Sequence, residues 1–493
     1  MKFVDRRREL KQLDDFYQRS QAGLLVVYGR RRVGKTSLLF QWLDDLTARQ
    51  KLPTDNSLFW TATTQGSQYQ LRDFSQAVIR LDPRLPTPPA PDFSFQAWDA
   101  AFGYLADLAA LRPAAPPFVV VIDEFTYLVQ GEPSIVSLLQ RVWDHRLARA
   151  SSLRLVLSGS LVGIMEKKVL SAQSPLYGRA TSLLKLNPLP FGSLVELFPT
   201  WSAAERVALF AVCGGIPSYL ALFDGAPNFT RGLRDSALAP GSLFFGDASL
   251  LLNERLTDPF IYSSVLASVA SGFHTWTEIA TMAGVLETNL GHYLDALQAL
   301  GMVERRTPVL AGPGNRRGRY HVRDPFLRFY YRFIIPHRTA IERGELKRVT
   351  ETIAADLRAF VGAHVFEELC REWVYYEADR GQLGFLPEEV GSFWAQQRGQ
   401  SVQLDIVAAS RRDKQLFIGE AKWGDKPVSR DVLIDLIKRS QRMPQVAEGW
   451  QTQYALFARA GFTDATREEA RTLNARLVDL SELEQGLRAS AKP

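Results

Sequence analysis

Between residues 23 and 195, short segments that are hydrophobic at every position alternate with longer segments whose hydrophobic residues lie three or four positions apart. A strand that is hydrophobic on both faces is typical of a parallel sheet covered by helices, and the longer segments have the spacing of a helix. The strand-like segments are 24–28, 118–122 and 153–157. This alternation predicts a parallel α/β domain over residues 1–195.

The pattern changes after residue 195. Residues 196–250 keep only the helical spacing, which predicts a small helical lid beside the α/β domain. Residues 251–336 contain three helical patterns followed by a Gly- and Arg-rich hairpin signal, which is the element order of a winged helix. Residues 340–493 begin with a helix that has one hydrophobic face and continue with short strands, which predicts a separate α/β domain.

Composition narrows the class of protein. The 493 residues suffice for several domains, and the 46% hydrophobic and 23% charged fractions are typical of a soluble globular protein. No hydrophobic run approaches the about 20 residues that a membrane helix needs, so we expect no membrane partner. The two cysteines, Cys213 and Cys370, are far apart in hydrophobic surroundings, which favours a cytoplasmic location. The net charge of +6 is compatible with a polyanionic partner but identifies none.

A glycine-rich loop stands directly after the first predicted strand and before a helix. It matches the pattern GxxxxGK[ST], and with the next residue it comprises Gly29, Arg30, Arg31, Arg32, Val33, Gly34, Lys35, Thr36 and Ser37. In such a loop the backbone N–H groups surround a β-phosphate, the lysine bridges the β- and γ-phosphates, and the threonine hydroxyl binds Mg²⁺. We therefore predict that these residues bind ATP and that Thr36 is a magnesium ligand.

Two carboxylates follow the strand at 118–122, at the edge where doubly wound sheets bind ligands. Asp123 is predicted to hold the magnesium ion, mostly through water, and Glu124 to orient and polarise the attacking water. The alternative is an acidic strand end that only caps the next helix. Catalysis of ATP hydrolysis by Asp123 and Glu124 is the preferred interpretation.

Two further positions carry weaker signals. The strand at 153–157 runs into Ser158-Gly159-Ser160, which places a small hydroxyl where many ATPases keep a polar sensor of the γ-phosphate. Arg179, at the end of the segment PLYGR, is a candidate catalytic cation that would neutralise transition-state charge in its own subunit or in a neighbouring one. A surface arginine explains that position equally well.

These motifs together resemble those of the archaeal and bacterial P-loop ATPases related to the STAND and AAA-like classes. The resemblance covers at least residues 1–225 and rests on FVDRRREL, GRRRVGKT, VVVIDEF, LSGS, PLYGR and CGGIPSYL. It implies a P-loop NTPase fold. It also implies that the opening segment helps to cover the adenine, which gives Phe3, Val4 and Arg6 an expected role in nucleotide binding.

The winged-helix prediction rests on two helices and a hairpin. Residues 276–284 and 288–302 are typical of a helix-turn-helix, but the second helix lacks the positive stripe of a strong DNA reader. The cations lie instead in the predicted wing, at Arg305, Arg306, Arg316, Arg317 and Arg319. They could contact DNA phosphates without reading sequence, or the segment could serve only as a packing module. Both interpretations stay open, with DNA as the predicted partner.

Acidic residues interrupt two hydrophobic strands near the carboxyl end. Asp405 lies in the segment 403–408, and Glu420 and Lys422 lie in the segment 416–423. If these strands pair as a hairpin, the acids converge and Lys422 projects to the same face as Glu420. Carboxylates suit Mg²⁺, and a lysine beside them can position or deprotonate an attacking water. We predict that all three residues catalyse metal-dependent DNA cleavage, with both acids as metal ligands.

The spacing D-x14-E-x-K on paired strands resembles the PD-(D/E)xK nuclease superfamily, whose fold is that of the restriction endonucleases. Residues 340–493 look like the domain often fused to archaeal-type ATPases. In that superfamily a helical glutamate adds to the metal site, and Glu367 matches it better than Glu368. Leu404 stands where many members have a proline. Two alternatives remain: surface carboxylates on edge strands, or a nuclease fold that no longer cuts.

The sequence thus predicts an α/β protein with a P-loop NTPase parallel sheet, a helical lid, a winged helix and a C-terminal restriction-endonuclease-like domain. The predicted function is ATP hydrolysis, with the ATP state gating a metal-dependent nuclease that acts on DNA. The alternative is a nucleotide-dependent switch or assembly protein whose C-terminal domain only binds DNA or a protein partner. ATP, Mg²⁺ and DNA are the predicted ligands, and a homo-oligomer is compatible with the sequence.

Overall fold

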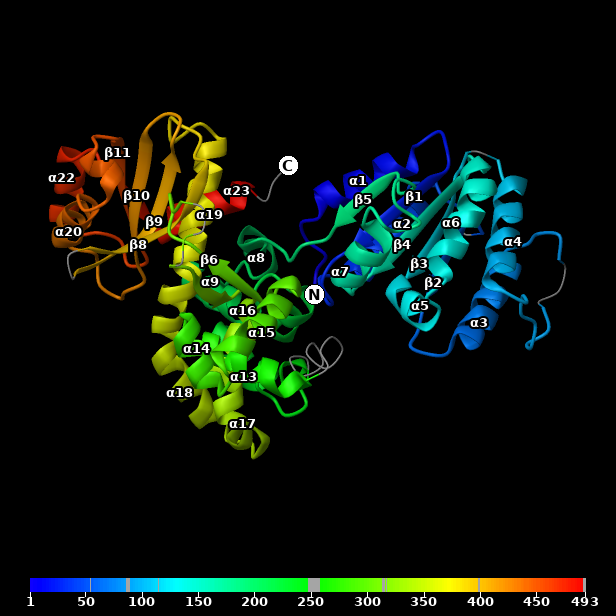
Figure 1. Cartoon of the computed structure of the whole chain (residues 1–493), viewed down its shortest axis with the longest axis horizontal. Coiled ribbons are helices and arrows are strands. Elements are labelled where there is room, and N and C mark those ends of the chain that lie inside the picture. Colours follow the sequence, from blue (N-terminus) through cyan, green and yellow to red (C-terminus); the bar gives the residue numbers. More distant parts are fainter. Residues whose placement is uncertain are drawn as a thin grey trace. The chain divides into compact units, whose positions relative to one another are not determined.

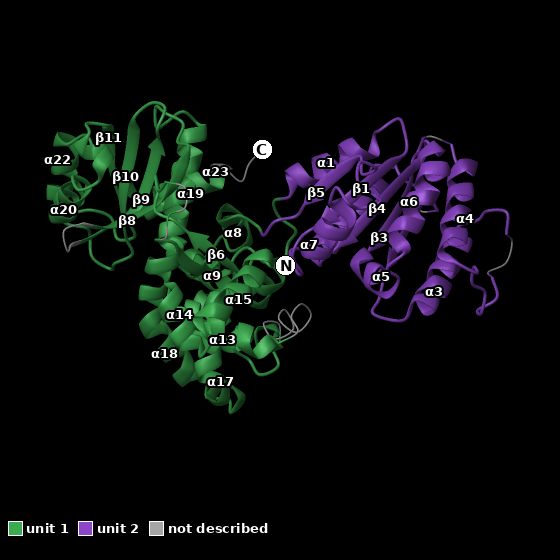
Figure 2. Cartoon of the chain, viewed as in Figure 1, with its two compact units in different colours: residues 1–5, 189–493 green, residues 6–188 purple. Residues whose placement is uncertain are grey.

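The computed structural model describes residues 1–53, 55–85, 89–113, 115–246, 258–312, 315, 317–397 and 400–490, without the side chains of 397, 400, 489 and 490. The chain forms two compact units (Figure 2): residues 6–188, the N-terminal unit, and residues 1–5 with 189–493, the C-terminal unit. The N-terminal unit is therefore shorter at both ends than the predicted domain of residues 1–195. The first five residues join the other unit because Ser193 donates a 2.6 Å hydrogen bond to Asp5 and the Met1 amine lies 2.8 Å from Asp224.

The N-terminal unit is a five-stranded parallel sheet between helices (Figure 1). Its strands are β1 (Gly23–Tyr28), β2 (Ser57–Thr61), β3 (Phe118–Asp123), β4 (Leu153–Gly159) and β5 (Ser182–Lys185). Its helices are α1 (Arg7–Tyr17), α2 (Lys35–Ala48), α3 (Ser67–Ile79), α4 (Trp98–Leu111), α5 (Phe125–Gly131), α6 (Ile135–His145) and α7 (Val162–Ile164), which continues as a π-helical segment Met165–Leu170.

The strand order in this sheet is β2-β3-β4-β1-β5, and neighbouring strands run parallel. Strands β3 and β4 are buried at every position, and β1 at every position but its last, so helices must cover both faces. The parallel α/β fold predicted from the hydrophobic pattern is confirmed.

The first part of the C-terminal unit is mainly helical. Its helices are α8 (Leu194–Leu197), α9 (Ala203–Cys213), α10 (Pro217–Leu220), α11 (Phe229–Gly232), α13 (Pro259–Ala270), α14 (Trp276–Ala283), α15 (Glu287–Ala299), α16 (Pro325–Phe329), α17 (Ile335–Glu342) and α18 (Leu346–Phe360), with π-helical segments Leu233–Ala237, Tyr330–Ile334 and Val361–Phe366. A two-stranded antiparallel hairpin of β6 (Val303–Arg306) and β7 (Arg319–Val322) follows α15. The predicted boundary between lid and winged helix, at residues 250 and 251, lies outside the described residues.

The rest of the C-terminal unit is a mixed sheet with helices on its two sides (Figure 1). The elements are α19 (Glu367–Asp379), β8 (Glu389–Gln397), β9 (Gln400–Ser410), β10 (Gln415–Lys422), α20 (Arg430–Ser440), α21 (Pro444–Ala447), β11 (Gln451–Ala458), α22 (Asp464–Thr472), β12 (Arg476–Asp479) and α23 (Leu480–Ser490). The order is β12-β11-β10-β9-β8, with β8, β9 and β10 antiparallel and the others parallel. A C-terminal α/β domain is therefore present.

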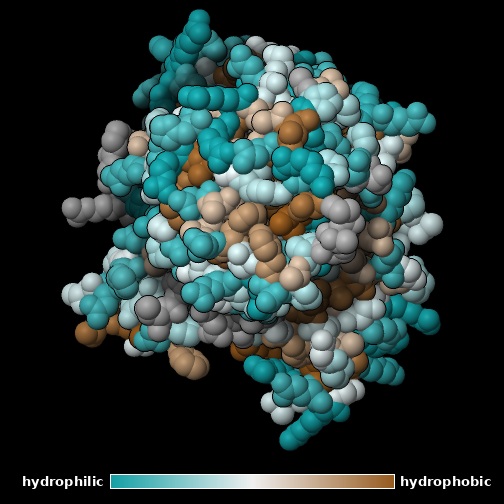
Figure 3. Space-filling view, turned by 90° about the vertical axis from the view of Figure 1, so that its right-hand side faces the viewer, coloured by the Kyte–Doolittle hydropathy of each residue, from teal (hydrophilic) through white to brown (hydrophobic). Residues whose placement is uncertain are grey.

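Over the described ranges, no helix is long and hydrophobic enough to cross a membrane. The face of the molecule in Figure 3 is mainly hydrophilic, and its hydrophobic side chains are interspersed among hydrophilic ones.

Candidate functional site

The predicted P-loop connects β1 to α2. Gly34 has a φ of 93°, a left-handed conformation that glycine adopts without strain, and a Cβ on Gly29 would lie 2.3 Å from the carbonyl oxygen of Leu186. Lys35 is buried, and its Nζ donates hydrogen bonds to the carbonyl oxygens of Gly29 (3.1 Å) and Arg30 (3.2 Å). The loop therefore curls round its own lysine at the N-terminus of a 14-residue helix, where anions are favoured.

The strand order brings the predicted acids to this loop. Because β4 lies between β1 and β3, the carboxyl ends of these three strands are neighbours. Thr36 Oγ1 donates a 2.7 Å hydrogen bond to Oδ2 of the buried Asp123, whose Oδ1 accepts the N–H of Glu124 at 3.0 Å. Ser160, directly after β4, donates its hydroxyl to Glu124 Oε2 at 2.7 Å. Of the two candidate sensor serines, Ser160 thus reaches the acid pair, whereas Ser158 is fully buried within β4.

Arg6 supports the P-loop from behind. It is buried, has a φ of 69°, and its Nη2 donates hydrogen bonds to the carbonyl oxygens of Val33 (3.2 Å) and Asn187 (2.8 Å). Its Nη1 also donates to Glu9 Oε1 at 2.9 Å, so Arg6 joins the loop at Val33 to residues outside it, and its expected role in covering the adenine stays a prediction. Phe3 and Val4, the other expected adenine contacts, belong to the C-terminal unit.

Arg179 is engaged within its own unit. Its Nε and Nη2 lie 3.1 and 3.0 Å from the two carboxylate oxygens of Asp144, and its Nη1 donates to the Tyr177 carbonyl oxygen at 3.0 Å. The hydrogen bonds from Arg179 lower the pKa of Asp144. A catalytic role for this arginine stays a prediction and requires the ion pair to open.

In the C-terminal domain, β9 and β10 pair antiparallel, as predicted. The last paired residues are Ile406 and Gly419, so Asp405 and Glu420 come next on adjacent strands. The N–H of Ala421 donates to Asp405 Oδ2 at 3.2 Å. On the other side of β9 the register shifts by one residue opposite Ser392, and such β-bulges re-aim side chains beside active sites. Asp405 thus accepts hydrogen bonds from both neighbouring strands, from Ser392 of β8 at its carbonyl oxygen and from the N–H of Ala421 of β10 at its carboxylate.

Glu420 is neutralised by two cations. Its Oε1 accepts a 2.7 Å hydrogen bond from Lys422 Nζ, and its Oε2 lies 2.9 Å from an Arg439 guanidinium nitrogen. Arg439, on α20, also donates to the Gln403 carbonyl oxygen at 2.6 Å and to Asp435 at 2.7 Å. Glu420 itself is only 4% exposed. The predicted pair of Glu420 and Lys422 therefore exists, with Arg439 as a third member.

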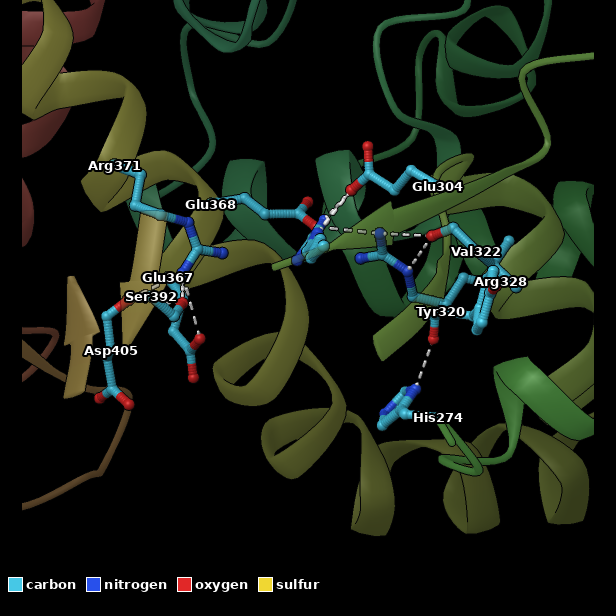
Figure 4. Close-up of polar contacts among 11 residues, drawn as sticks. His274, Glu304, Tyr320, Val322, Arg328, Glu367, Glu368, Arg371, Ser392 and Asp405 are labelled. Atoms are coloured by element: carbon cyan, nitrogen blue, oxygen red, sulfur yellow. Dashed lines mark hydrogen bonds and ion pairs between the residues drawn. The ribbon is translucent and has the colours of Figure 1, made fainter. Parts of the chain in front are cut away.

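Helix α19 presents two adjacent glutamates to different partners (Figure 4). Arg371, one turn later, donates from Nη1 to the Asp405 carbonyl oxygen and Ser392 Oγ, both at 2.9 Å, and to Glu367 at 3.4 Å. Glu368 accepts hydrogen bonds from Arg306 at 2.6 Å and Arg328 at 3.0 Å.

The electrostatics of the two glutamates differ accordingly. Burial and the nearby charge of Asp405 raise the pKa of Glu367, while burial and the charge of Glu420 raise the pKa of Asp405. Burial would also raise the pKa of Glu368, but the charges of Arg328 and Arg306 outweigh it and lower that pKa to about 2. Glu367 is thus the glutamate that shares its surroundings with Asp405.

These acids are not assembled as a ready-made metal site. Among the residues that the structure describes, no group of three or more His, Cys, Asp or Glu is arranged to hold a metal ion. The predicted ligand set of Glu367, Asp405 and Glu420 is therefore not gathered round one point, because Glu420 is turned to Lys422 and Arg439.

The predicted winged-helix segment contains two consecutive helices and a hairpin. Thr275 and Glu278 form a capping box that starts α14, and Gly284, with a φ of 67°, ends it before α15. Of the predicted wing cations, Arg305 and Arg317 are exposed, whereas Arg306 is turned inward to Glu304 and Glu368. Arg319 is half-buried, and Arg316 lies outside the described residues.

Comparison with known proteins adds the family. Residues 3–223 match a family described as "ATPase domain predominantly from Archaea", and residues 330–434 match one described as "Archaea bacterial proteins of unknown function". The chain is 31% identical over 423 residues to "Uncharacterized protein MJECL04" of Methanocaldococcus jannaschii, which covers 86% of this chain and 88% of that protein. The chain belongs to this family of archaeal-type ATPases.

Two further proteins are similar to parts of this archaeal-type ATPase. A 43-residue stretch is 44% identical to "Uncharacterized ATP-binding protein MJ0423" of the same organism, over 9% of this chain and 73% of that protein. The solved structure of the Walker-type ATPase PABY2304 of Pyrococcus abyssi matches with a TM-score of 0.50 and 18% identity, over 67% of this chain and 96% of that one. At that identity the match shows a common fold.

Two arginines of the C-terminal candidate site were not predicted from sequence. Arg371 lies four positions after Glu367, and Arg439 four positions after Asp435, so both belong to acid–arginine pairs at helical spacing. That spacing is a visible signal, but it normally indicates a solvated helix face. Only the packing of α19 and α20 against β9 shows that Arg371 reaches the Asp405 carbonyl oxygen and Arg439 the Gln403 carbonyl oxygen.

Proposed function

We propose that this archaeal-type ATPase binds and hydrolyses ATP in its N-terminal unit and that the nucleotide state gates metal-dependent cleavage of DNA by its C-terminal domain. The observation that carries the first half is the 2.7 Å hydrogen bond from Thr36 Oγ1 to Asp123 Oδ2. It joins two oxygens that are both suited to Mg²⁺, beside a loop whose backbone and lysine are suited to phosphate.

In this proposal Lys35 binds the β- and γ-phosphates within the loop Gly29–Ser37. Thr36 and Asp123 would hold the magnesium ion, which supplies positive charge to the phosphate oxygens. Glu124 orients the attacking water and polarises it, and its carboxylate is kept in place for this by the Ser160 hydroxyl.

The second half of the proposal concerns the acids of the C-terminal domain. Asp405 and Glu420 occupy neighbouring positions on paired strands, and Glu367 shares the surroundings of Asp405. Once Glu420 is released from Lys422 and Arg439, these three carboxylates would hold a divalent cation, which would supply charge stabilisation at a scissile phosphate. Lys422, now bonded to Glu420, would position or deprotonate the attacking water. We assign this domain to the PD-(D/E)xK type on that arrangement.

We further propose that α14, α15 and the β6–β7 hairpin act as a winged helix that contacts DNA phosphates. The exposed guanidinium groups of Arg305 and Arg317 support this role, because phosphate contacts require positive charge but no base recognition. Arg306 is not available for the same purpose, since it bonds Glu304 and Glu368.

The nuclease assignment is tested by cutting of plasmid DNA with Mg²⁺ or Mn²⁺. We expect Asp405→Ala and Lys422→Ala to lose about 100-fold or more of the activity, because each removes a group that acts at the reacting atoms, while thermal unfolding still shows a folded chain. Lys426→Ala, at an exposed lysine of the same region, is the matched control and should cut like the wild type. Undiminished cutting by both site variants would overturn the assignment.

A second candidate function is a nucleotide-dependent switch whose C-terminal domain only binds DNA or a protein. The observation that favours it is the engagement of Glu420 by Lys422 and Arg439, which neutralises the carboxylate without a metal ion. Under this alternative the wild type hydrolyses ATP but cuts no DNA with either metal, and its affinity for DNA or for a partner changes between ATP and ADP.

A further inference from the structure

A cavity of about 460 Å³ lies inside the C-terminal unit, between the predicted wing and the edge of the mixed sheet. One wall consists of the start of α14, Arg305 of β6, and residues 317–320 at the beginning of β7. The other wall consists of the end of β8 and Ser401 of β9. Its volume is within the range of about 300–1,000 Å³ that is typical of ligand sites. The ATPase and nuclease motifs do not account for this cavity.

The lining is positively charged and aromatic. It includes Arg305, Arg317 and Arg319, and none of the described lining residues is acidic. The same lining includes Trp276 and Tyr320, whose ring centroids are 6.3 Å apart. Trp276 is 36% exposed, so part of its ring is free to contact a ligand. Arginines interleaved with aromatic rings are typical of sites that bind nucleic-acid backbone and bases together.

The wall formed by Trp394 is held rigidly. Its Nε1 donates a 3.0 Å hydrogen bond to the Arg317 carbonyl oxygen, and the Arg319 guanidinium lies 4.8 Å from its ring centroid. These contacts connect the hairpin to β8 and order the Arg319 guanidinium before any ligand binds. Such preorganisation lowers the entropic cost of binding.

Strand β9 leads from the cavity to the candidate nuclease site, because Ser401 lines the cavity and Asp405 lies four residues later. Trp394 pairs with Gln403, which is two residues before Asp405 on the same strand. The Gln403 carbonyl oxygen accepts a 2.6 Å hydrogen bond from Arg439, the residue that also contacts Glu420. A chain of polar groups therefore leads from the cavity to the acids.

We propose that this cavity binds single-stranded nucleic acid, with a base against Trp276 and phosphates on Arg305, Arg317 and Arg319. A strand held there continues along β9 to Asp405. A single strand fits these features because its bases are free to stack on side chains, whereas duplex bases are already stacked on one another. The cavity shares Arg305 and Arg317 with the proposed winged-helix contact to DNA, which this inference makes more specific, and delivery to Asp405 rests on the proposed nuclease function.

The test is fluorescence anisotropy with the full chain, in EDTA so that no divalent metal is present. The probes are labelled oligothymidylate and oligouridylate of 15 nucleotides and a duplex of the same length. Trp276→Ala is expected to weaken single-strand binding by roughly 5- to 100-fold, since a base stack is worth about 1–3 kcal/mol. Arg317→Ala is expected to lower the salt dependence by about 0.7 in log–log slope, the loss of one phosphate contact.

Matched controls are Tyr375→Ala, an aromatic on α19 that is 49% exposed, and Arg348→Ala on α18, whose side chain is 70% exposed. Both should bind like the wild type. Comparison of the two single strands identifies DNA or RNA as the better ligand, and either result supports the proposal. Duplex bound more tightly than both strands, or no effect of Trp276→Ala and Arg317→Ala, would overturn it. Because this assay measures binding and not cleavage, its result stays valid even if the protein proves not to be a nuclease.

Discussion

The guanidinium of Arg306 on β6 donates a 2.6 Å hydrogen bond to the carboxylate of Glu368 on α19, the residue next to the candidate metal ligand Glu367. Arg328 donates to the same carboxylate oxygen at 3.0 Å and to the Val322 carbonyl oxygen at 2.8 Å. The hairpin is thereby fastened to the helix that carries Glu367. A bound nucleic acid that displaces the hairpin would therefore also shift α19 and with it Glu367.

The first prediction concerns the strength of this connection. Side-chain exposures of 31% and 28% place Arg306 and Glu368 away from bulk water, so their interaction is screened less than that of a surface pair. A double-mutant cycle of Arg306→Ala and Glu368→Ala, measured by urea unfolding, should give a coupling energy of about 1–2 kcal/mol. The exposed pair of Arg348 and Glu345 is the matched control and should give less than about 0.5 kcal/mol. Equal coupling in the two cycles would contradict a structural role for Arg306.

The second prediction concerns ATP hydrolysis. Glu124→Gln keeps the size of the side chain but removes the base, so phosphate release should fall by about 10²- to 10⁴-fold while binding of a fluorescent ATP analogue persists. Ser160→Ala, which removes the hydroxyl donor to Glu124, should cause a smaller loss of about 10-fold. Glu166→Gln, at a glutamate exposed beside Lys185, serves as the control. Hydrolysis at the wild-type rate by Glu124→Gln would rule out the assigned role.

The third prediction concerns the buried arginine behind the P-loop. Arg6 bonds the Val33 carbonyl oxygen within the loop, so Arg6→Ala should loosen the loop and weaken ATP binding by about 10-fold, the worth of one charged hydrogen bond. Arg7→Ala changes the next residue, which is exposed, and should leave the affinity unchanged. Titration with a fluorescent ATP analogue measures both variants. Equal affinities for the two would show that Arg6 does not support the loop.

The fourth prediction concerns pH. The imidazole of His321 stacks on that of His274 with centroids 4.3 Å apart, and burial, then the charges of Arg306, His274, Arg328 and His364, lower the pKa of His321 to about 2. The unfolded chain, with a histidine pKa of about 6.5, binds more protons than the folded chain between these values. Stability is therefore fully present above pH 6.5 and falls as the pH drops, by up to about 1.4 kcal/mol per pH unit for this histidine.

Urea unfolding at pH 7.5, 6.5 and 5.5 measures that slope. His321→Asn removes the titrating group and should make the loss of stability on acidification shallower. His145→Asn, at an exposed histidine, is the control and should keep the wild-type slope. The same slope in His321→Asn as in the wild type would contradict a buried neutral imidazole.

The parts of the fold that could be predicted are those that depend on local pattern. Uninterrupted hydrophobic runs identified the parallel strands, and the strand–loop–helix context identified the P-loop, because both signals lie within about ten residues of sequence. The pairing of β9 with β10 was also within reach, since the two strands are joined by a short connection.

What escaped prediction depends on contacts between distant segments. The bulge at Asp405 arises only when β8 pairs with β9, and no residue of β9 signals it alone. Arg306 was grouped with the wing cations because its sequence neighbours are basic, yet a glutamate 62 positions away turns it inward. The position of the Arg439 guanidinium is likewise set by a residue on another element, Glu420 of β10.

The central claim, an ATP-gated nuclease, is tested most directly by digestion of supercoiled plasmid with Mg²⁺ or Mn²⁺, with and without ATP, for the wild type, Lys35→Ala and Asp405→Ala. We expect that Asp405→Ala does not cut, that ATP changes the rate for the wild type, and that Lys35→Ala cuts at a rate insensitive to ATP. An absence of cutting under all these conditions, with ATP hydrolysis intact in the wild type, would contradict an ATP-gated nuclease.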